Sequence, residues 1–166
     1  TFLSVKHGCS IMLEMPNGKV MVYDVGSLMN PRRASRVLEQ ALWAKGHRRI
    51  DALVLSHADS DHYNGADSLL NQISVDRVLM TSHFIDDQQQ GTIKISNRLT
   101  SLGIPIDEVT KGDRINLDPT VSIQVLHPST DHNMGNDNSV SIVLEISYGG
   151  RSLLLTGDLE DPGLSE

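Results

Sequence analysis

Cysteine, aromatic residues and long apolar runs are all scarce in this chain of 166 residues. The single cysteine, Cys9, excludes an internal disulfide, and we expect it to pack as a small apolar residue. No run approaches the roughly 20 apolar residues that span a bilayer, and the chain opens at Thr1 in a strand pattern without the features of a signal peptide. We therefore expect a soluble, globular unit, with any targeting or membrane segment outside this sequence.

Basic residues are fewer than acidic ones, and the formal net charge is -7. This balance argues against a surface that adheres broadly to nucleic acid. Six basic residues nevertheless gather in one short stretch: Arg32, Arg33, Arg36, Lys45, Arg48 and Arg49. The stretch is either a local phosphate-binding patch or the solvated face of a helix.

The apolar content of 39% is enough for one domain with an ordinary core, and no linker or short repeat divides residues 1–166. The pattern predicts strands at 2–5, 10–14, 20–23, 50–55, 75–80, 106–109, 114–117, 121–126, 140–146 and 152–156. Helices are expected from Pro31 to Gly46, at 66–72 and at 86–102, although 86–90 could instead be a loop. Asn17-Gly18 and Gly149-Gly150 predict hairpin turns.

The densest group of chemically active side chains is His57-Ala58-Asp59-Ser60-Asp61-His62, directly after the apolar run 53–55. Imidazoles and carboxylates are costly to bury unless a cation pairs with them, so this loop predicts a bound metal. Residues two apart in an extended chain point the same way, so His57, Asp59 and Asp61 can converge while His62 turns to a second position. The segment could therefore hold two metal ions. The alternative is a polar loop that caps the following helix and leaves its histidines solvated.

Further candidate ligands follow other strands. Asp24 comes directly after the strand at 20–23, and Asp158 follows the strand at 152–156 in the sequence Thr156-Gly157-Asp158. A carboxylate has two oxygens and can bridge two ions, which suits Asp158 to that role. A middle ligand is expected from His127, His132, Asp137 or Asn138, with the segment 136–139 favoured. The lone histidines His7, His47 and His83 are expected to be ordinary surface or core residues.

Taken together, these residues resemble the metallo-β-lactamase superfamily, in which a hydrophobic strand is followed by His-x-His/Asp-x-Asp-His and later by Gly-Asp. Within that superfamily, the chain is similar to the C-terminal domain of ComEC-type DNA-uptake (competence) proteins, where an Asp such as Asp59 replaces the usual second histidine. The similar segments are 2–8, 22–26, 49–57 and 152–160.

The resemblance implies an α/β fold, a four-layer αβ/βα sandwich truncated at the C-terminus, with the metal site at one edge. Carried over by position, Asp24 would brace the metal loop and Asp158 would bridge the ions. The first metal would be held by His57 and Asp59, and the second by Asp61 and His62. The superfamily's middle histidine has no clear counterpart, and the last ligand would lie beyond Glu166, so we expect a fragment of a longer protein with weak or partial metal loading.

Imidazoles and carboxylates without thiolate suit two divalent ions, zinc or manganese. The resemblance implies a nuclease in which such ions activate water against a phosphodiester of single-stranded DNA, with Asp61 as the catalytic residue that orients the nucleophile. It also implies a full-length protein in the bacterial cell membrane, joined to a membrane channel domain, with this domain on the extracytoplasmic side. Two alternatives stay open: a small-molecule ester, thioester or lactone hydrolase, and a non-catalytic domain of the same fold.

Overall fold

The computed structural model describes residues 1–129, 136–161 and 163–165. Its larger sheet has the strand order β1-β2-β4-β6-β7. The first two strands form an antiparallel hairpin, and the rest pair in parallel. The strands are β1 (Ile11–Glu14), β2 (Val20–Tyr23), β4 (Ala52–Val54), β6 (Val78–Met80) and β7 (Ile106–Glu108). Two short parallel strands, β3 (Arg49–Ile50) and β5 (Ser74–Val75), precede β4 and β6.

A second sheet is antiparallel, with the order β10-β9-β8. It consists of β8 (Ser122–His127), β9 (Val143–Tyr148) and β10 (Arg151–Leu155). The glycine pair at 149–150 has positive φ at both positions, as the tight turn between β9 and β10 requires. The Tyr23 hydroxyl donates a hydrogen bond of 2.5 Å to the Ile142 carbonyl and so links the two sheets.

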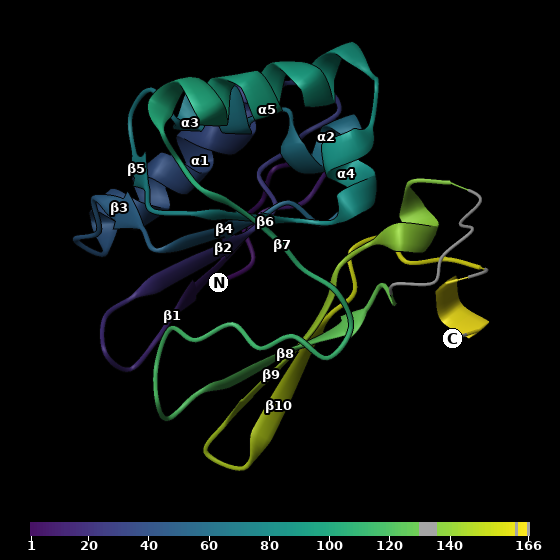
Figure 1. Cartoon of the computed structure of the whole chain (residues 1–166). Coiled ribbons are helices and arrows are strands. Elements are labelled where there is room, and N and C mark those ends of the chain that lie inside the picture. The colour runs from purple at the N-terminus through teal and green to yellow at the C-terminus, as the bar shows by residue number, and fades with distance from the viewer. Residues whose placement is uncertain (130–135, 162, 166) are drawn as a thin grey trace.

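The helices lie over one face of the larger sheet, and the second sheet lies on the opposite side (Figure 1). They are α1 (Pro31–Ala44), α2 (Ser60–Tyr63), α3 (Ala66–Leu69), α4 (Ser82–Asp86) and α5 (Gln90–Leu102). Two 3-10 turns, η1 (Asn138–Val140) and η2 (Gly163–Ser165), follow β8 and β10. Helix α1 begins as predicted, because the Asn30 side chain accepts a hydrogen bond from the Arg33 amide and Pro31 occupies the first turn.

Two hydrophobic cores follow from the alternation of side chains along the buried strands. In β2, Val20 and Val22 face the core beneath the helices, whereas Met21 and Tyr23 face the core between the two sheets. A strand buried on both faces reads as an unbroken apolar run, which is why β2 shows no polar alternation. Each such side chain contributes about 1.5–3 kcal/mol when fully buried. The larger sheet is therefore the rigid centre from which the loops of the site project.

The α/β prediction is confirmed, and of the four layers implied by the resemblance the described residues form three: helices, sheet and sheet. Within this described part of the chain, no helix is long and apolar enough to cross a bilayer.

Predictions for four segments differ from the structure. Residues 2–5 and 114–117 form only single bridges, from Phe2 to Ile11 and from Arg114 to Gln124, rather than strands. The segment 86–102 is not one helix, because α4 ends at Asp86 and α5 begins at Gln90, so the loop alternative holds there. The strand expected to start at 140 starts at Val143, because η1 occupies 138–140. In each of these segments, polar and apolar residues are neighbours in the sequence, so contacts with the rest of the fold decide the secondary structure.

Candidate metal centre

Side chains from several strand ends meet at one edge of the larger sheet. Parallel strands present their carboxyl ends at the same edge, which places Asp24 after β2 beside Ser56 and His57 after β4. The second sheet brings Asp158 to this edge from the end of β10. The Ile142 amide donates to the Ser56 carbonyl across 2.8 Å and ties the two sheets together here. Residues far apart in the chain thus converge on one place.

Three glycines allow the loops of this edge to pack backbone against backbone. A Cβ on Gly26 would lie 2.1 Å from the Asp61 carbonyl oxygen, and one on Gly8 would lie 2.7 Å from the same atom. A Cβ on Gly65 would lie 2.6 Å from the Val25 carbonyl oxygen. No side chain fits at such distances, so the loop that carries the expected ligands is fixed from both sides.

The two histidines of the predicted loop and the predicted bridging aspartate come together. One ligand atom each from His57, His62 and Asp158 all lie within 4.8 Å of one another. The Nε2 atom of His62 is 3.4 Å from Oδ2 of Asp158, and the imidazole centroids of the two histidines are 4.1 Å apart. Both histidines are buried, whereas 56% of the Asp158 side chain is exposed, so the group opens to solvent on the aspartate side.

The opposite nitrogens of both rings are held by groups behind them. Nδ1 of His62 lies 2.8 Å from Oδ2 of Asp24, and Nδ1 of His57 lies 2.9 Å from the Ser56 hydroxyl. The same Asp24 carboxylate accepts from the Ser56 amide and hydroxyl, each at 2.7 Å. A carboxylate behind a histidine fixes its tautomer and turns the other nitrogen outward, which is the usual support of a metal ligand. This position matches the bracing role that the resemblance implied for Asp24.

The electrostatics of the two rings differ. Burial lowers the pKa of His57, and the neighbouring His62 lowers it further, so His57 is neutral and its ring can accept a cation. Burial also lowers the pKa of His62, but the hydrogen bond and charge of Asp24, followed by Asp158 and Asp61, outweigh this and raise the pKa to about 9. Without a metal, the proton on His62 balances the surrounding carboxylates.

The other two predicted ligands lie at the margin of this group. Oδ2 of Asp59 is 3.7 Å from Nε2 of His57, and its side chain is about half exposed. Asp61 contributes its charge to the pKa of His62, but within the described residues its carboxylate belongs to no cluster of three ligand atoms. Its carbonyl accepts a hydrogen bond from the Cys9 amide, which fixes the backbone of the loop. The structure therefore groups His57, His62 and Asp158, with Asp59 beside them.

The four candidates for the middle ligand separate. The ring of His127 contacts the Ser141 carbonyl through Nδ1 at 3.0 Å, and His132 lies outside the described residues. Asp137 turns away, since its carboxylate accepts from His83 at 2.8 Å and from Gln89 at 3.2 Å.

Asn138 is different. Its side-chain Oδ1 is buried and has no hydrogen-bond partner. Asn138 stands in η1, four residues before Ile142, which bonds to Ser56 at the start of the metal loop.

A second cluster of ligand atoms, from Cys9, Asp24 and His62, overlaps the first. Burial and the charge of Asp24 raise the pKa of the Cys9 thiol far above its ordinary value, so the sulfur is protonated in the metal-free protein. Asp24 and Nδ1 of His62 are already paired with each other. Cys9 is partly buried and packs against the core between the two sheets, as the small apolar residue that the sequence predicted.

The arrangement fits a divalent metal ion. Nε2 of His57 is buried without a hydrogen-bond partner, which is costly unless a cation takes its lone pair. Two ligands at about 2.1 Å from a tetrahedral ion are roughly 3.4 Å apart, which equals the separation of His62 and Asp158. Nitrogen and carboxylate donors suit zinc, and the carboxylates also suit manganese.

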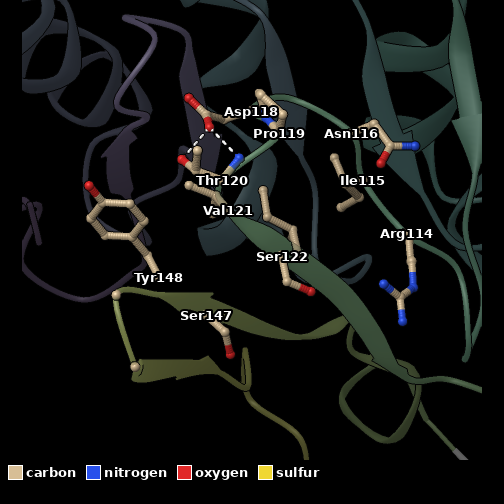
Figure 2. A pocket seen from close by; sticks show the side chains of 13 residues that line it. Arg114, Ile115, Asn116, Asp118, Pro119, Thr120, Val121, Ser122, Ser147 and Tyr148 are labelled. Atoms are coloured by element: carbon tan, nitrogen blue, oxygen red, sulfur yellow. Dashed lines mark hydrogen bonds between the residues drawn. The ribbon is translucent and has the colours of Figure 1, made fainter.

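A polar pocket of about 380 Å³ lies elsewhere, between the β9–β10 turn and the segment 114–121 (Figure 2). Figure 2 shows Asp118 bonded to Thr120 on one side and the guanidinium of Arg114 on the other. The β9–β10 turn and Asp158 are at opposite ends of β10, which is roughly 13 Å long. This pocket is therefore separate from the metal ligands.

Sequence reasoning missed the supporting residues. Ser56 joins Asp24 to both histidine rings, and Gly26 allows its loop to reach Asp61. In the sequence, Ser56 is recognisable as a hydroxyl residue between a buried strand and the ligand His57, and Gly26 as a glycine two residues after Asp24. Neither feature identifies a supporting residue of the site unless β2 is known to pair with β4.

Comparison with known proteins agrees with the resemblance. A family model described as the metallo-beta-lactamase superfamily matches residues 7–164. ComE operon protein 3 of Bacillus subtilis (strain 168) is 36% identical over 131 residues, which are 79% of this chain and 16% of that protein. Competence protein ComA of Neisseria gonorrhoeae is 31% identical over 161 residues, 94% of this chain and 19% of that protein. The chain thus spans less than a fifth of the length of either relative.

Solved structures share the fold at low identity. A metallo-beta-lactamase with a HARLDQ motif from Cronobacter sakazakii matches with a TM-score of 0.62 and 16% identity, over 98% of this chain and 57% of that one. Zn²⁺-bound PqqB from Methylobacterium extorquens matches with a TM-score of 0.60 and 15% identity, over 89% and 52%. The diiron β-hydroxylase CmlA from Streptomyces venezuelae matches with a TM-score of 0.54 and 18% identity, over 93% and 28%. The family model covers nearly the whole chain and the fold agrees, so the chain belongs to the metallo-beta-lactamase superfamily.

Proposed function

We propose that this chain is a metal-dependent phosphodiesterase domain that cleaves single-stranded DNA in a DNA-uptake protein. The observation that carries the metal dependence is the pair of buried imidazoles, His57 and His62, whose Nδ1 atoms are held from behind. Nε2 of His62 lies 3.4 Å from Asp158, and a ligand atom of His57 lies within 4.8 Å of both. The choice of DNA rests on the similarity to two competence proteins. By the same analogy, the parent protein joins this domain to a membrane channel domain and places it on the extracytoplasmic side.

The ligand set would consist of His57, His62 and Asp158, with Asp59 beside His57 and Asn138 as the middle ligand. Two divalent ions, zinc or manganese, held there would supply Lewis acidity to the phosphodiester and to the attacking water. The residues around them do the positioning: Asp24 and Ser56 orient the rings, and the exposed side of Asp158 leaves room for a substrate phosphate. Asp61 would orient the nucleophile, and its negative charge already acts on the ring of His62.

The test is cleavage of a labelled single-stranded oligonucleotide by the purified chain after chelator treatment and reloading with Mn²⁺ or Zn²⁺. We expect cleavage that needs the added metal and is lost in Asp61→Ala. The matched control is Asp107→Asn, which removes a half-exposed carboxylate of β7 paired with Arg77 and should leave cleavage unchanged. Cleavage that persists in Asp61→Ala would overturn the role of Asp61, and cleavage without metal would overturn the proposal.

The same preparation distinguishes the alternatives. Turnover of activated esters, thioesters or lactones without DNA cleavage would replace the nuclease with a small-molecule hydrolase, a class that the net charge of -7 also suits. Neither activity, together with no metal above background, would identify a non-catalytic domain.

A further inference from the structure

Three arginines on α1 line a groove that the proposed catalysis does not use. The groove has a volume of about 440 Å³ and begins at the N-cap of the helix. Its lining is polar except for one valine: Asn30, Arg32, Arg33, Arg36, Val37 and Gln40. Gln40 stands ten residues from Asn30, so the lining extends over roughly 15 Å of helix. All three arginines are exposed.

These arginines differ from three others whose ion pairs stabilise the fold. Arg49, Arg77 and Arg98 each form an ion pair with an aspartate. Within the described ranges, none of the three α1 arginines forms an ion pair with a carboxylate. The single acidic residue of α1, Glu39, lies one turn beyond Arg36 and is partly buried. In a chain with a net charge of -7, the groove is a local concentration of positive charge, which the nearby Glu39 offsets only at Arg36.

The groove is next to the metal loop. A Cβ on Gly65, three residues after His62, would lie 3.1 Å from the Pro31 carbonyl oxygen at the start of α1. The preceding segment is anchored on the same side, since the Ser27 amide donates to the Asn64 side chain at 3.1 Å. Leu28 and Met29, between this anchor and the groove, are 64% and 70% exposed. Along the sequence, these two exposed apolar side chains stand between the anchor at Ser27 and the arginines of α1.

We propose that this groove binds the backbone of a single-stranded nucleic acid, with Arg32, Arg33 and Arg36 on successive phosphates. The proposal rests on the proposed function, because it assigns the groove to the substrate of the metal site. Guanidinium groups pair with phosphate oxygens through two parallel hydrogen bonds, and the positive end of the α1 dipole adds to the attraction at Asn30. The groove would offset the repulsion between a polyanion and an acidic protein, and would position the strand next to the ligands.

The shape of the site favours an extended chain over a lipid surface. The arginines line a concavity rather than a flat face, and a single strand can follow it while its bases contact Leu28 and Met29. Arginine can also pair with two phosphate oxygens at once, whereas lysine would serve equally well on a surface that attracts anions by charge alone.

The test is equilibrium binding of a labelled single-stranded oligonucleotide to the whole chain in the presence of EDTA, over a range of salt concentrations. The variant is R32Q/R33Q/R36Q, which keeps polar side chains on exposed positions. Three phosphate contacts contribute a slope of about -2 to the plot of log affinity against log salt, so wild-type affinity should fall about 20-fold more than that of the variant between about 50 and 200 mM salt. The matched control is K111Q/R114Q/R151Q, which removes three exposed charges associated with the second sheet.

The expected result is weaker binding and a smaller salt slope for the α1 variant, with the control close to wild type. Equal losses in both variants would show a general charge effect and overturn the proposal, as would the absence of oligonucleotide binding by the wild type. Arginine-dependent binding to vesicles containing phosphatidylglycerol, without oligonucleotide binding, would assign the groove to a membrane surface instead.

A separate assay keeps this result distinct from the proposed function. Hydrolysis of bis(p-nitrophenyl) phosphate by the Mn²⁺-loaded chain needs the metal site but no extended substrate. We expect the α1 variant to hydrolyse it as the wild type does. If neither protein hydrolyses it, the proposed function is wrong, while the binding experiment still shows whether the groove binds a single strand. If both proteins hydrolyse it and the three substitutions leave oligonucleotide binding unchanged, the assignment of the groove is wrong and the proposed function stands.

Discussion

Oδ2 of Asp24 lies 2.8 Å from Nδ1 of His62, and both side chains are buried. Asp24 has a left-handed backbone, with φ of 60°, which is strained for a residue other than glycine. Such strain persists only where surrounding contacts fix it, and here Ser56 donates two hydrogen bonds to the same carboxylate. The pair therefore holds one ligand of the proposed metal centre in a fixed orientation.

Asp24→Asn should lower metal affinity about 10-fold to 100-fold, because an amide cannot accept from Ser56 and hold the His62 ring as a carboxylate does. Asp24→Ala should also lower the free energy of unfolding by about 3 kcal/mol, since it removes the partner that keeps the buried His62 ring charged and leaves the two Ser56 donors unpaired. Chelator competition and urea unfolding measure the two effects. The control Asp107→Asn should change neither, and an Asp24→Asn protein with full affinity would show that the pair does not support the site.

The metal-free protein should be most stable near pH 6.5. The folded pKa of His62, about 9, is above its unfolded value, so its contribution is fully present below pH 6.5 and is lost as the pH rises through 9. This loss amounts to at most about 3 kcal/mol. The folded pKa of His57 is below its unfolded value, so the unfolded chain binds this proton more readily. Stability should therefore also decline below pH 6.5. Urea unfolding in EDTA across this range tests the prediction, and His62→Gln should flatten the alkaline decline. A stability that rises between pH 7 and 9.5 would contradict it.

Gly26→Ala should destabilise the protein and weaken the metal site together. The added Cβ would lie 2.1 Å from the Asp61 carbonyl oxygen, so the two loops must separate, at a cost of about 1–3 kcal/mol or more. Gly46→Ala is the matched control, because no atom lies within 4 Å of its Cβ and its cost is limited to its backbone conformation, about 1 kcal/mol. Thermal unfolding and metal titration of both variants give the comparison. Equal affinity in the two would mean that the contact with Asp61 does not position the ligands.

Asn138→Leu should reduce metal affinity with little loss of stability. The side-chain Oδ1 of Asn138 is buried without a partner, so an apolar replacement removes an unsatisfied group and should be nearly neutral for folding. The control is Asn136→Leu, whose oxygen accepts from the Ser139 amide and whose loss should affect stability instead. If Asn138→Leu binds metal as tightly as the wild type, Asn138 is not the middle ligand.

The sequence predicted the parts of the site that are local in the chain. His57, Asp59, Asp61 and His62 stand within six residues, and their chemistry is apparent without a fold. Asp24 and Asp158 were also recognisable, because each follows a buried strand directly, and strand ends are where parallel sheets present side chains. That His57, His62 and Asp158 share one centre depended on the resemblance, and the distances now support it.

The rest depended on packing between distant segments. The orientation of Asp137 is decided by its contact with His83, which is 54 residues away in the sequence. Whether His127 or Asn138 faces the metal loop depends on the bond from Ile142 to Ser56, which joins residues 86 positions apart. The segments 2–5 and 114–117 have strand composition, but each gains only one bridge from its neighbours. Local pattern cannot supply these pairings, because they arise from which sheets come to lie against each other.

The most direct test of the metal centre is a calorimetric titration of the chelator-treated chain with Zn²⁺, beside the double variant His57→Ala/His62→Ala. We expect at least one bound ion per wild-type chain, with proton release from His62, and no comparable binding by a folded double variant. A wild type that binds no metal, or a double variant that binds it equally well, would contradict the assignment of this loop as a metal centre.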